Sequence, residues 1–195
     1  MTGVLNMYCP PLFDDAWSDG EDLYSERKTI RCRYTEGQPS VFWLSGFFFV
    51  QSFLTAALQN FARKRQIPID MIGYHHNMLK EDESELTEKP EEGVYVYGLF
   101  LEGCGWDQAQ QKLCESSPRV LFSKAPCMWL QPFESSLLPE TQTYSCPVYR
   151  TAERRGTLAT TGHSTNFVMF VNMPSDECSS HWTKRGVAML SQLSD

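Results

Sequence analysis

The sequence predicts an α+β fold in which one long buried helix packs against an antiparallel, barrel-like sheet of about six short strands. The helix is predicted from an uncharged stretch, residues 41–58 (VFWLSGFFFVQSFLTAAL), which continues into an amphipathic pattern. The strands are predicted from later segments rich in Val, Ile, Phe, Tyr and Trp. Apolar residues make up 42% of the 195 residues and charged residues 21%, so the protein has enough apolar surface to bury a core.

The long helix is predicted to begin at Ser45, which can cap it, and to end before Pro68, which cannot continue a helix. Basic residues 63–65 would complement the negative end of the helix dipole. Gln51 and Thr55 lie on a polar edge. The apolar side chains recur every three or four residues and share one face: Phe47, Val50, Leu54, Ala57, Leu58 and Phe61. We therefore expect a buried helix with one polar edge.

The same uncharged stretch leaves a single-span membrane protein as an alternative, because its length is about the minimum that crosses a bilayer as a helix. A helix surrounded by lipid would need apolar side chains on all sides, or a partner for its polar edge. The sequence has no second long apolar segment to supply that partner. The buried helix is the preferred interpretation.

Six short segments are predicted as strands, separated by clusters of Gly, Pro, Asn and Ser. They are residues 69–74, 93–101, 119–122, 127–130, 144–149 and 166–172. The final segment, residues 181–193, is predicted to be a short helix that turns into a last strand. Residues 80–92 (KEDESELTEKPEE) are predicted to be a solvated acidic loop.

The protein is predicted to consist of a poorly ordered leader, residues 1–39, and one domain, residues 40–195. The leader has an acidic run and a basic run but no sustained apolar period.

The net charge of −7 gives the whole molecule no electrostatic reason to bind nucleic acid or anionic lipid. Seven cysteines without a C-x-x-C pair, and no apparent signal peptide, indicate free thiols in a reducing cytoplasm.

No phosphate-binding loop is found in the sequence. Gly103-Cys104-Gly105 lacks both the lysine and the further glycine of the known motifs. The protein alone is therefore not expected to hydrolyse nucleotide, and we expect it to hold no cofactor.

A serine hydrolase is a second alternative. Gly162-His163-Ser164-Thr165-Asn166 resembles a nucleophile elbow, but Asn166 replaces the last glycine and a strand-like segment follows. Ser164 with His163 or His181 would be the catalytic pair, and the preferred interpretation is a polar turn.

Metal binding is not expected. Cys178 and His181 have half of a zinc spacing, and His75 and His76 would point to opposite sides of a strand, partly exposed. We assign no catalytic, cofactor or metal residue. Three basic clusters could contact an acidic partner or be solvated. They are residues 63–65, Arg150 with Arg154 and Arg155, and Lys184 with Arg185.

Four ordered blocks carry a resemblance: WLSGFFFVQSFLTAALQNFARK, GLFLEGCGWD, YSCPVYRTAERRGTLATTGHSTNFV and HWTKRGVAML. Over residues 40–193 they closely resemble the C-terminal domain of dynein heavy chains, most of all the axonemal branch. The resemblance implies helices packed with an incomplete antiparallel β-barrel, lying on one face of a ring of six AAA-type ATPase units. The long helix would meet the barrel or a neighbouring module.

The implied role is non-catalytic: the domain braces or regulates the ring of a motor protein in microtubule-based movement of cilia and flagella. ATP and Mg would be bound elsewhere in a heavy chain. The implied partners are the ring modules, the intermediate, light intermediate and light chains of the dynein complex, and microtubules indirectly, with no nucleic acid and no membrane. The implied location is the cytoplasm and cytoskeleton, with the cilium axoneme as the expected site.

Two features depart from the family pattern. Residues 1–39 show no resemblance to the helical segment that joins this domain to the ring. Cys104-Gly105 stands where the axonemal pattern usually has an Ala-Arg pair, so a ring contact through that arginine would be missing.

Overall fold

The computed structural model describes residues 39–47, 50–134, 142–154 and 166–191. These residues form two α-helices, α2 (Val50–Arg65) and α3 (Ser179–Lys184), and two 3-10 turns, η2 (Leu44–Gly46) and η3 (Ile69–Met71). The strands are β1 (Val41–Trp43), β2 (Ile72–Met78), β3 (Val94–Tyr97), β4 (Phe100–Glu102), β5 (Gly105–Asp107), β6 (Lys112–Cys114), β7 (Phe122–Lys124), β8 (Met128–Glu134), β9 (Thr143–Tyr149), β10 (Phe167–Pro174) and β11 (Ala188–Leu190).

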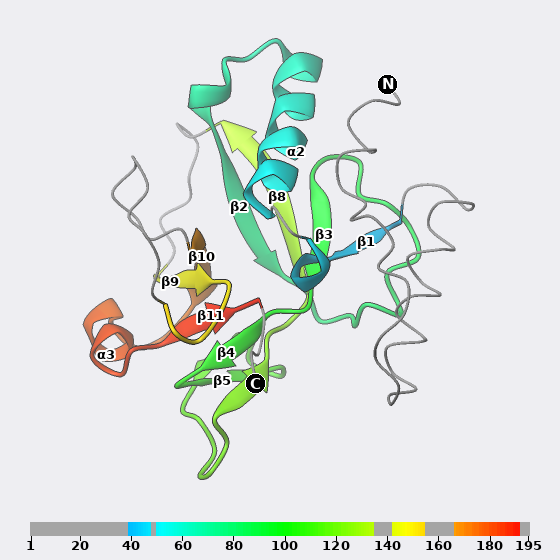
Figure 1. The fold of residues 1–195 in the computed structure, drawn as a ribbon. Helices are drawn as coiled ribbons and strands as arrows, with labels where there is room; N and C mark the ends of the chain where they lie inside the picture. The colour runs from blue at the N-terminus through cyan, green and yellow to red at the C-terminus, as the bar shows by residue number, and fades with distance from the viewer. Residues whose placement is uncertain (1–38, 48–49, 135–141, 155–165, 192–195) are drawn as a thin grey trace, which may run out of the picture.

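The strands form three sheets. A four-stranded sheet has the order β1-β3-β8-β2, a five-stranded sheet has the order β10-β9-β11-β4-β7, and β5 pairs with β6 alone. Most neighbours are antiparallel, but β1 runs parallel to β3 and β11 runs parallel to β9. Figure 1 shows α2 beside the upper sheet, α3 at one side of the lower sheet, and β4 and β5 at the lower end.

The predicted fold class is therefore wrong in its architecture. The regular elements of the described residues are mostly strands, in several sheets without a closed barrel, and α2 is their one helix of more than six residues. The segment predicted as a single strand, residues 93–101, explains much of the error. It divides after β3 at Gly98, whose φ of +86° turns the backbone, and β4 then joins the other sheet.

The uncharged stretch contains three elements rather than one helix. Residues 41–43 are strand β1, and residues 44–46 are η2. Ser45 does not cap α2, because its hydroxyl donates to the carbonyl oxygen of Gly98. The side chain of Trp43 lies where a Cβ on Gly98 would be. A short aromatic and β-branched run favours a strand as readily as a buried helix, and tertiary packing decides between them.

The end of α2 agrees with the prediction. The helix stops at Arg65, and Gln66 takes a left-handed φ of 57°. The amide of Ile67 then donates to the carbonyl oxygen of Ala62 at 3.1 Å, as in a Schellman motif. Pro68 follows directly. The basic residues 63–65 occupy the last turn, as predicted.

The core lies mainly within and between the sheets. Val96 and Leu101 have no exposed surface, Val148 has 1%, and every residue of β11 is buried. From α2 only Val50, Leu54 and Ala62 are buried; the predicted face residues Phe47, Ala57, Leu58 and Phe61 are half-buried. The helix thus covers one side of the core instead of forming its centre.

Near the start of α2, three aromatic rings connect the helix to β1. The rings of Phe47 and Phe53 stack with centroids 4.4 Å apart, and the ring of Phe42 lies 4.8 Å from that of Phe53.

The C-terminal prediction of a short helix and a last strand is confirmed by α3 and β11. Strands β5 and β6 had no sequence prediction. Within the described part of the protein, none of the helices combines the length and the apolar character that a membrane span requires.

Candidate interaction surfaces

Two edge strands lie side by side: β2 of the four-stranded sheet and β10 of the five-stranded sheet. We call the contact between them the seam. The amide of Asn172 on β10 donates to Nδ1 of His76 on β2 at 3.5 Å. Nε2 of Gln51 on α2 donates to the carbonyl oxygens of Phe167 and Val168 at 3.0 and 3.2 Å. These side chains occupy backbone groups of an edge strand that could otherwise pair with another protein.

His76 is the titratable group of this seam. Burial, with a smaller contribution from the neighbouring His75, lowers the pKa of His76 to about 4. Its Nε2 has no hydrogen-bond partner among the described residues. Both histidines are half-buried in β2, consistent with the predicted partial exposure. The ring is therefore neutral at pH 7, and it joins the two sheets as an acceptor.

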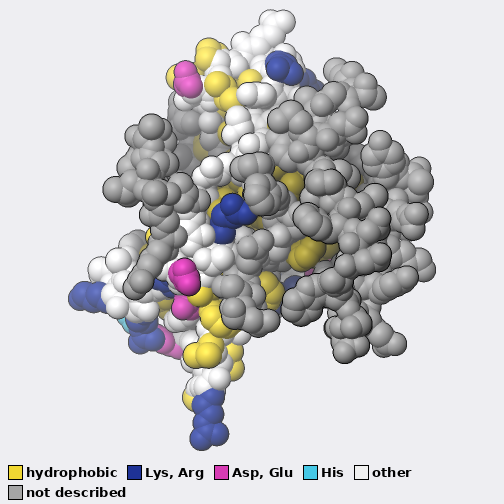
Figure 2. All heavy atoms as spheres, in the orientation of Figure 1, with side chains coloured by type: hydrophobic (Ala, Val, Ile, Leu, Met, Phe, Trp, Pro, Cys, Tyr) yellow, Lys and Arg dark blue, Asp and Glu magenta, His cyan; other side chains and the backbone are white. Residues whose placement is uncertain are grey.

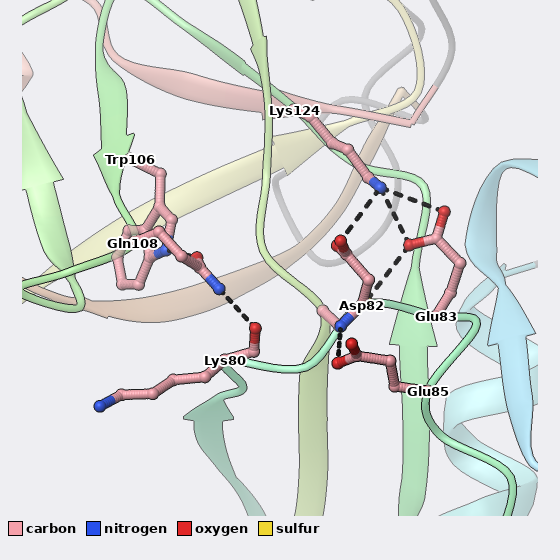
Figure 3. Close-up of polar contacts among 8 residues, drawn as sticks. Lys80, Asp82, Glu83, Glu85, Trp106, Gln108 and Lys124 are labelled. Carbon is pink, nitrogen blue, oxygen red and sulfur yellow. Dashed lines mark hydrogen bonds and ion pairs between the residues drawn. The ribbon is translucent and has the colours of Figure 1, made fainter.

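The acidic loop between β2 and β3 is anchored at its base. Nζ of Lys124 on β7 lies 2.9 Å from an oxygen of Glu83 and 3.7 Å from Asp82, and Nε2 of Gln108 donates to the carbonyl oxygen of Lys80 at 2.7 Å. Figure 3 shows these contacts converging on the loop from two sides. Burial raises the pKa of Glu83, but the hydrogen bond and the charge of Lys124 outweigh it and leave that pKa below its usual value.

The far end of the same loop is fixed by Glu92. Its carboxylate accepts from Arg65 at 2.6 Å and lies 3.6 Å from Lys64. Its carbonyl oxygen accepts from the Trp129 indole at 2.9 Å. The loop is exposed, as predicted, but its two ends are tied to β5–β7, α2 and β8. Four of its carboxylates have no ion pair with the described residues: Glu81, Glu85, Glu88 and Glu91.

The buried thiols have the properties of small apolar residues. Burial raises the pKa of Cys104 to about 12 and the pKa of Cys127 to about 11, and it raises that of Cys146 further. Each of the three is at most 2% exposed, and the cysteines of the described residues are free. A thiol that stays protonated is a poor nucleophile and a poor metal ligand.

Residues considered for a zinc or hydrolase site do not come together where the structure describes them. Nε2 of His181 lies 3.0 Å from a carboxylate oxygen of Glu115, whereas Sγ of Cys178 lies 3.1 Å from the Ser180 hydroxyl. No group of three or more His, Cys, Asp or Glu side chains within the described ranges is arranged to hold a metal ion. The other two hydrolase candidates, His163 and Ser164, lie outside those ranges.

The loop between β6 and β7, residues 115–121, projects from the lower end of the molecule (Figure 1). We call it the β6–β7 loop. Its Leu121 side chain is 76% exposed and its Val120 side chain 44%. Figure 2 shows hydrophobic and basic side chains at this end. The prediction of a strand over residues 119–122 was wrong for the first three of them, because β7 begins at Phe122.

A tight turn shapes this loop. The amide of Val120 donates to the carbonyl oxygen of Ser117 at 3.1 Å, and Arg119 has a φ of 69°. With Pro118 before the arginine, this is the pattern of a type II turn. The hydroxyl of Ser116 donates to the carbonyl oxygen of Val120 at 2.9 Å. The Ser-Ser-Pro sequence before Arg119 is the turn signal that could have predicted the loop.

The remaining basic clusters have mixed environments. Arg154 pairs with Glu102, and Arg185 pairs with Glu115. Lys184 is exposed at the end of α3. Arg155 lies outside the described residues. These clusters are partly structural, so basic charge alone does not select a partner surface.

The sequence is similar to a known domain family and to the heavy chains of axonemal dyneins. The family described as the C-terminal domain of dynein heavy chains matches residues 21–191, which begins before the predicted domain start at residue 40. Human dynein axonemal heavy chain 12 is 49% identical over 174 residues, 89% of this chain and 6% of that protein. Human dynein axonemal heavy chain 3 is 49% identical over 158 residues, 81% of this chain and 4% of that protein.

A third relative, rat dynein axonemal heavy chain 1, is 46% identical over 172 residues, 88% of this chain and 4% of that protein. The 195 residues thus span only a small fraction of the length of these relatives. The comparisons give no support to a serine hydrolase or to a membrane protein.

Proposed function

Because the protein belongs to the family of C-terminal domains of dynein heavy chains, we propose that it braces or regulates the AAA-type ATPase ring of an axonemal-type heavy chain in microtubule-based movement. The observation that carries this proposal is the match to axonemal heavy chains over most of the sequence. The ion pairs of the described residues join loops, helices and sheets to one another, which suits a domain that acts by contact.

The domain acts by contact and not by chemistry. ATP and Mg are bound in other parts of the heavy chain, and no catalytic, cofactor or metal residue is supplied by this domain. The raised pKa values of the buried thiols and the separate partners of Cys178 and His181 are consistent with that assignment.

The direct partners in this proposal are the ring modules. The intermediate, light intermediate and light chains and the microtubule are reached through the complex, and neither nucleic acid nor a membrane is a partner. The place of action is the cytoskeleton of the cytoplasm, and in particular the cilium axoneme.

The test is to add the 195-residue protein to an axonemal heavy chain truncated before its C-terminal domain. We expect measurable association and a change in microtubule-stimulated ATPase rate or stepping. An unrelated β-rich protein of similar size and charge serves as the control. If the protein neither binds nor changes the motor, the proposed bracing role is refuted.

A further inference from the structure

We propose that the β6–β7 loop is a docking element that inserts Leu121 into an apolar pocket bordered by carboxylates on another part of the same heavy chain. This inference rests on the proposed function, because it places the partner within the heavy chain. It adds the surface that makes the contact and the chemistry of the surface that receives it.

The apolar part of the argument is the exposure of two neighbouring side chains. At 76% exposed, Leu121 is the most exposed large hydrophobic side chain of the described residues, and Val120 is next to it at 44%. Single exposed apolar residues are ordinary, but an adjacent pair on a projection can enter a concave partner. Anchors of this kind supply much of the binding energy at protein interfaces.

The rigidity of the loop supports the same use. The turn hydrogen bond from Val120 to Ser117, the fixed φ of Pro118 and the bond from the Ser116 hydroxyl hold the tip. At the base, Glu115 pairs with both Arg185 and His181 of the α3 region. A projection that is already ordered loses little conformational entropy when it binds.

Arg119 indicates the charge of the partner. Its backbone is left-handed, with a φ of 69°, as are those of Gln66, Gln111 and Arg154, so its charge and exposure indicate the partner and its backbone conformation does not. Its side chain is exposed and has no ion pair with the described residues. In a protein with a net charge of −7, an exposed cation beside two apolar side chains is suited to an acidic rim.

The proposed function places that surface in the heavy chain, and the length of the relatives leaves ample room for it. The matched region is 6% or less of each heavy chain, so nearly all of such a protein remains available to contact the loop. We therefore assign the loop to a contact within the heavy chain and not to a second copy of this protein.

The test uses the full 195-residue protein and the axonemal heavy chain truncated before its C-terminal domain, with the dissociation constant as the readout. The loop variants are Arg119→Gly and Leu121→Ser, singly and together. Glycine accepts the left-handed φ, and Leu121 is exposed, so both variants should fold. The matched control is Lys89→Ala with Met71→Ser, which changes an exposed cation and a 48% exposed apolar side chain outside the β6–β7 loop.

We expect each loop variant to raise the dissociation constant, and the double variant to raise it by at least about tenfold, while the control stays within about twofold. Thermal melting checks that every variant still folds. Arg119→Gly should also reduce the salt dependence of binding, because it removes the charge that faces the acidic rim.

Each other outcome contradicts a specific statement. If wild type binds and the double loop variant binds equally well, the loop assignment is overturned while the proposed function stands. If the control weakens binding as much as the loop variant does, the effect is not specific to the loop and the assignment is overturned. Self-association of the protein that depends on Leu121 would replace the heavy-chain partner with a second copy. If wild type does not bind at all, the proposed function fails, and this inference fails with it.

Discussion

Acidification should destabilise the fold through His76. Burial lowers the pKa of this histidine from its ordinary value of 6.5 to about 4. Between those two values the unfolded protein binds a proton that the folded protein does not, so the free energy of unfolding falls as the pH falls. Each pH unit across this window removes about 1.4 kcal/mol, which gives a total of about 3 kcal/mol from this one group.

The assay is urea unfolding of the wild type and of His76→Asn at several pH values from 7 to 4. Asparagine keeps an acceptor near the position of Nδ1, which takes the Asn172 amide, but it does not titrate in this range. The variant should therefore lose most of the decline between pH 6.5 and 4. His75→Asn is the control and should retain most of it, because burial is the larger cause of the lowered pKa. Equal declines in wild type and His76→Asn would refute the reasoning.

Three further predictions concern packing and backbone conformation. Leu54→Ala should lower the free energy of unfolding, measured by urea unfolding, by about 2 to 5 kcal/mol, because it leaves a cavity. Thr55→Ala, on the exposed side of the helix, is the control and should change the free energy of unfolding by about 0.5 kcal/mol or less. Gly98→Ala should cost about 2 to 5 kcal/mol, because the added Cβ meets Trp43 and the φ of +86° disfavours alanine; a melting temperature equal to that of wild type would contradict this. Arg119→Gly should raise the free energy of unfolding by about 0.5 to 1 kcal/mol, and a clear fall in the melting temperature would show that the strain argument is wrong.

The sequence predicted local elements better than their arrangement. The end of α2 and the order of α3 and β11 follow from local signals, namely basic residues before a proline and a short helix before an apolar run. Which strands share a sheet is decided by contacts between residues far apart in the sequence. Gly98 is a local signal for a break between Val96 and Leu101, but nothing local indicates that the two sides of the break belong to different sheets.

The uncharged stretch shows the same limit in another way. Its apolar periodicity is compatible with a helix from Ser45 onward, but Val41, Phe42 and Trp43 find a pairing partner in β3. That parallel partner comes about fifty residues later, so no window of local sequence contains it. The burial of α2 also depends on contacts with residues that lie outside any local window, which is why its degree of burial was overestimated.

The surface was the least predictable part. The basic clusters stand out in the sequence, yet Arg154 and Arg185 are used within the fold. The exposed Leu121 lies in a run with an apolar character, and the sequence alone could not show that it points away from the core. The Ser-Ser-Pro turn signal before Arg119 was present, but composition cannot tell how far a turn projects.

The position of β11 has a consequence for how the protein folds as it is made. This strand lies in the middle of the five-stranded sheet, between β9 and β4, although it is the last strand in sequence order among the described residues. While the ribosome is still synthesising the region around Trp182, β4 and β9 lack the strand that joins them. The unpaired edges of β4 and β9 can then pair with strands of other polypeptides, which favours aggregation. A nonsense mutation shortly before Ala188 would leave the nascent protein in that condition permanently, and we expect cells to degrade it.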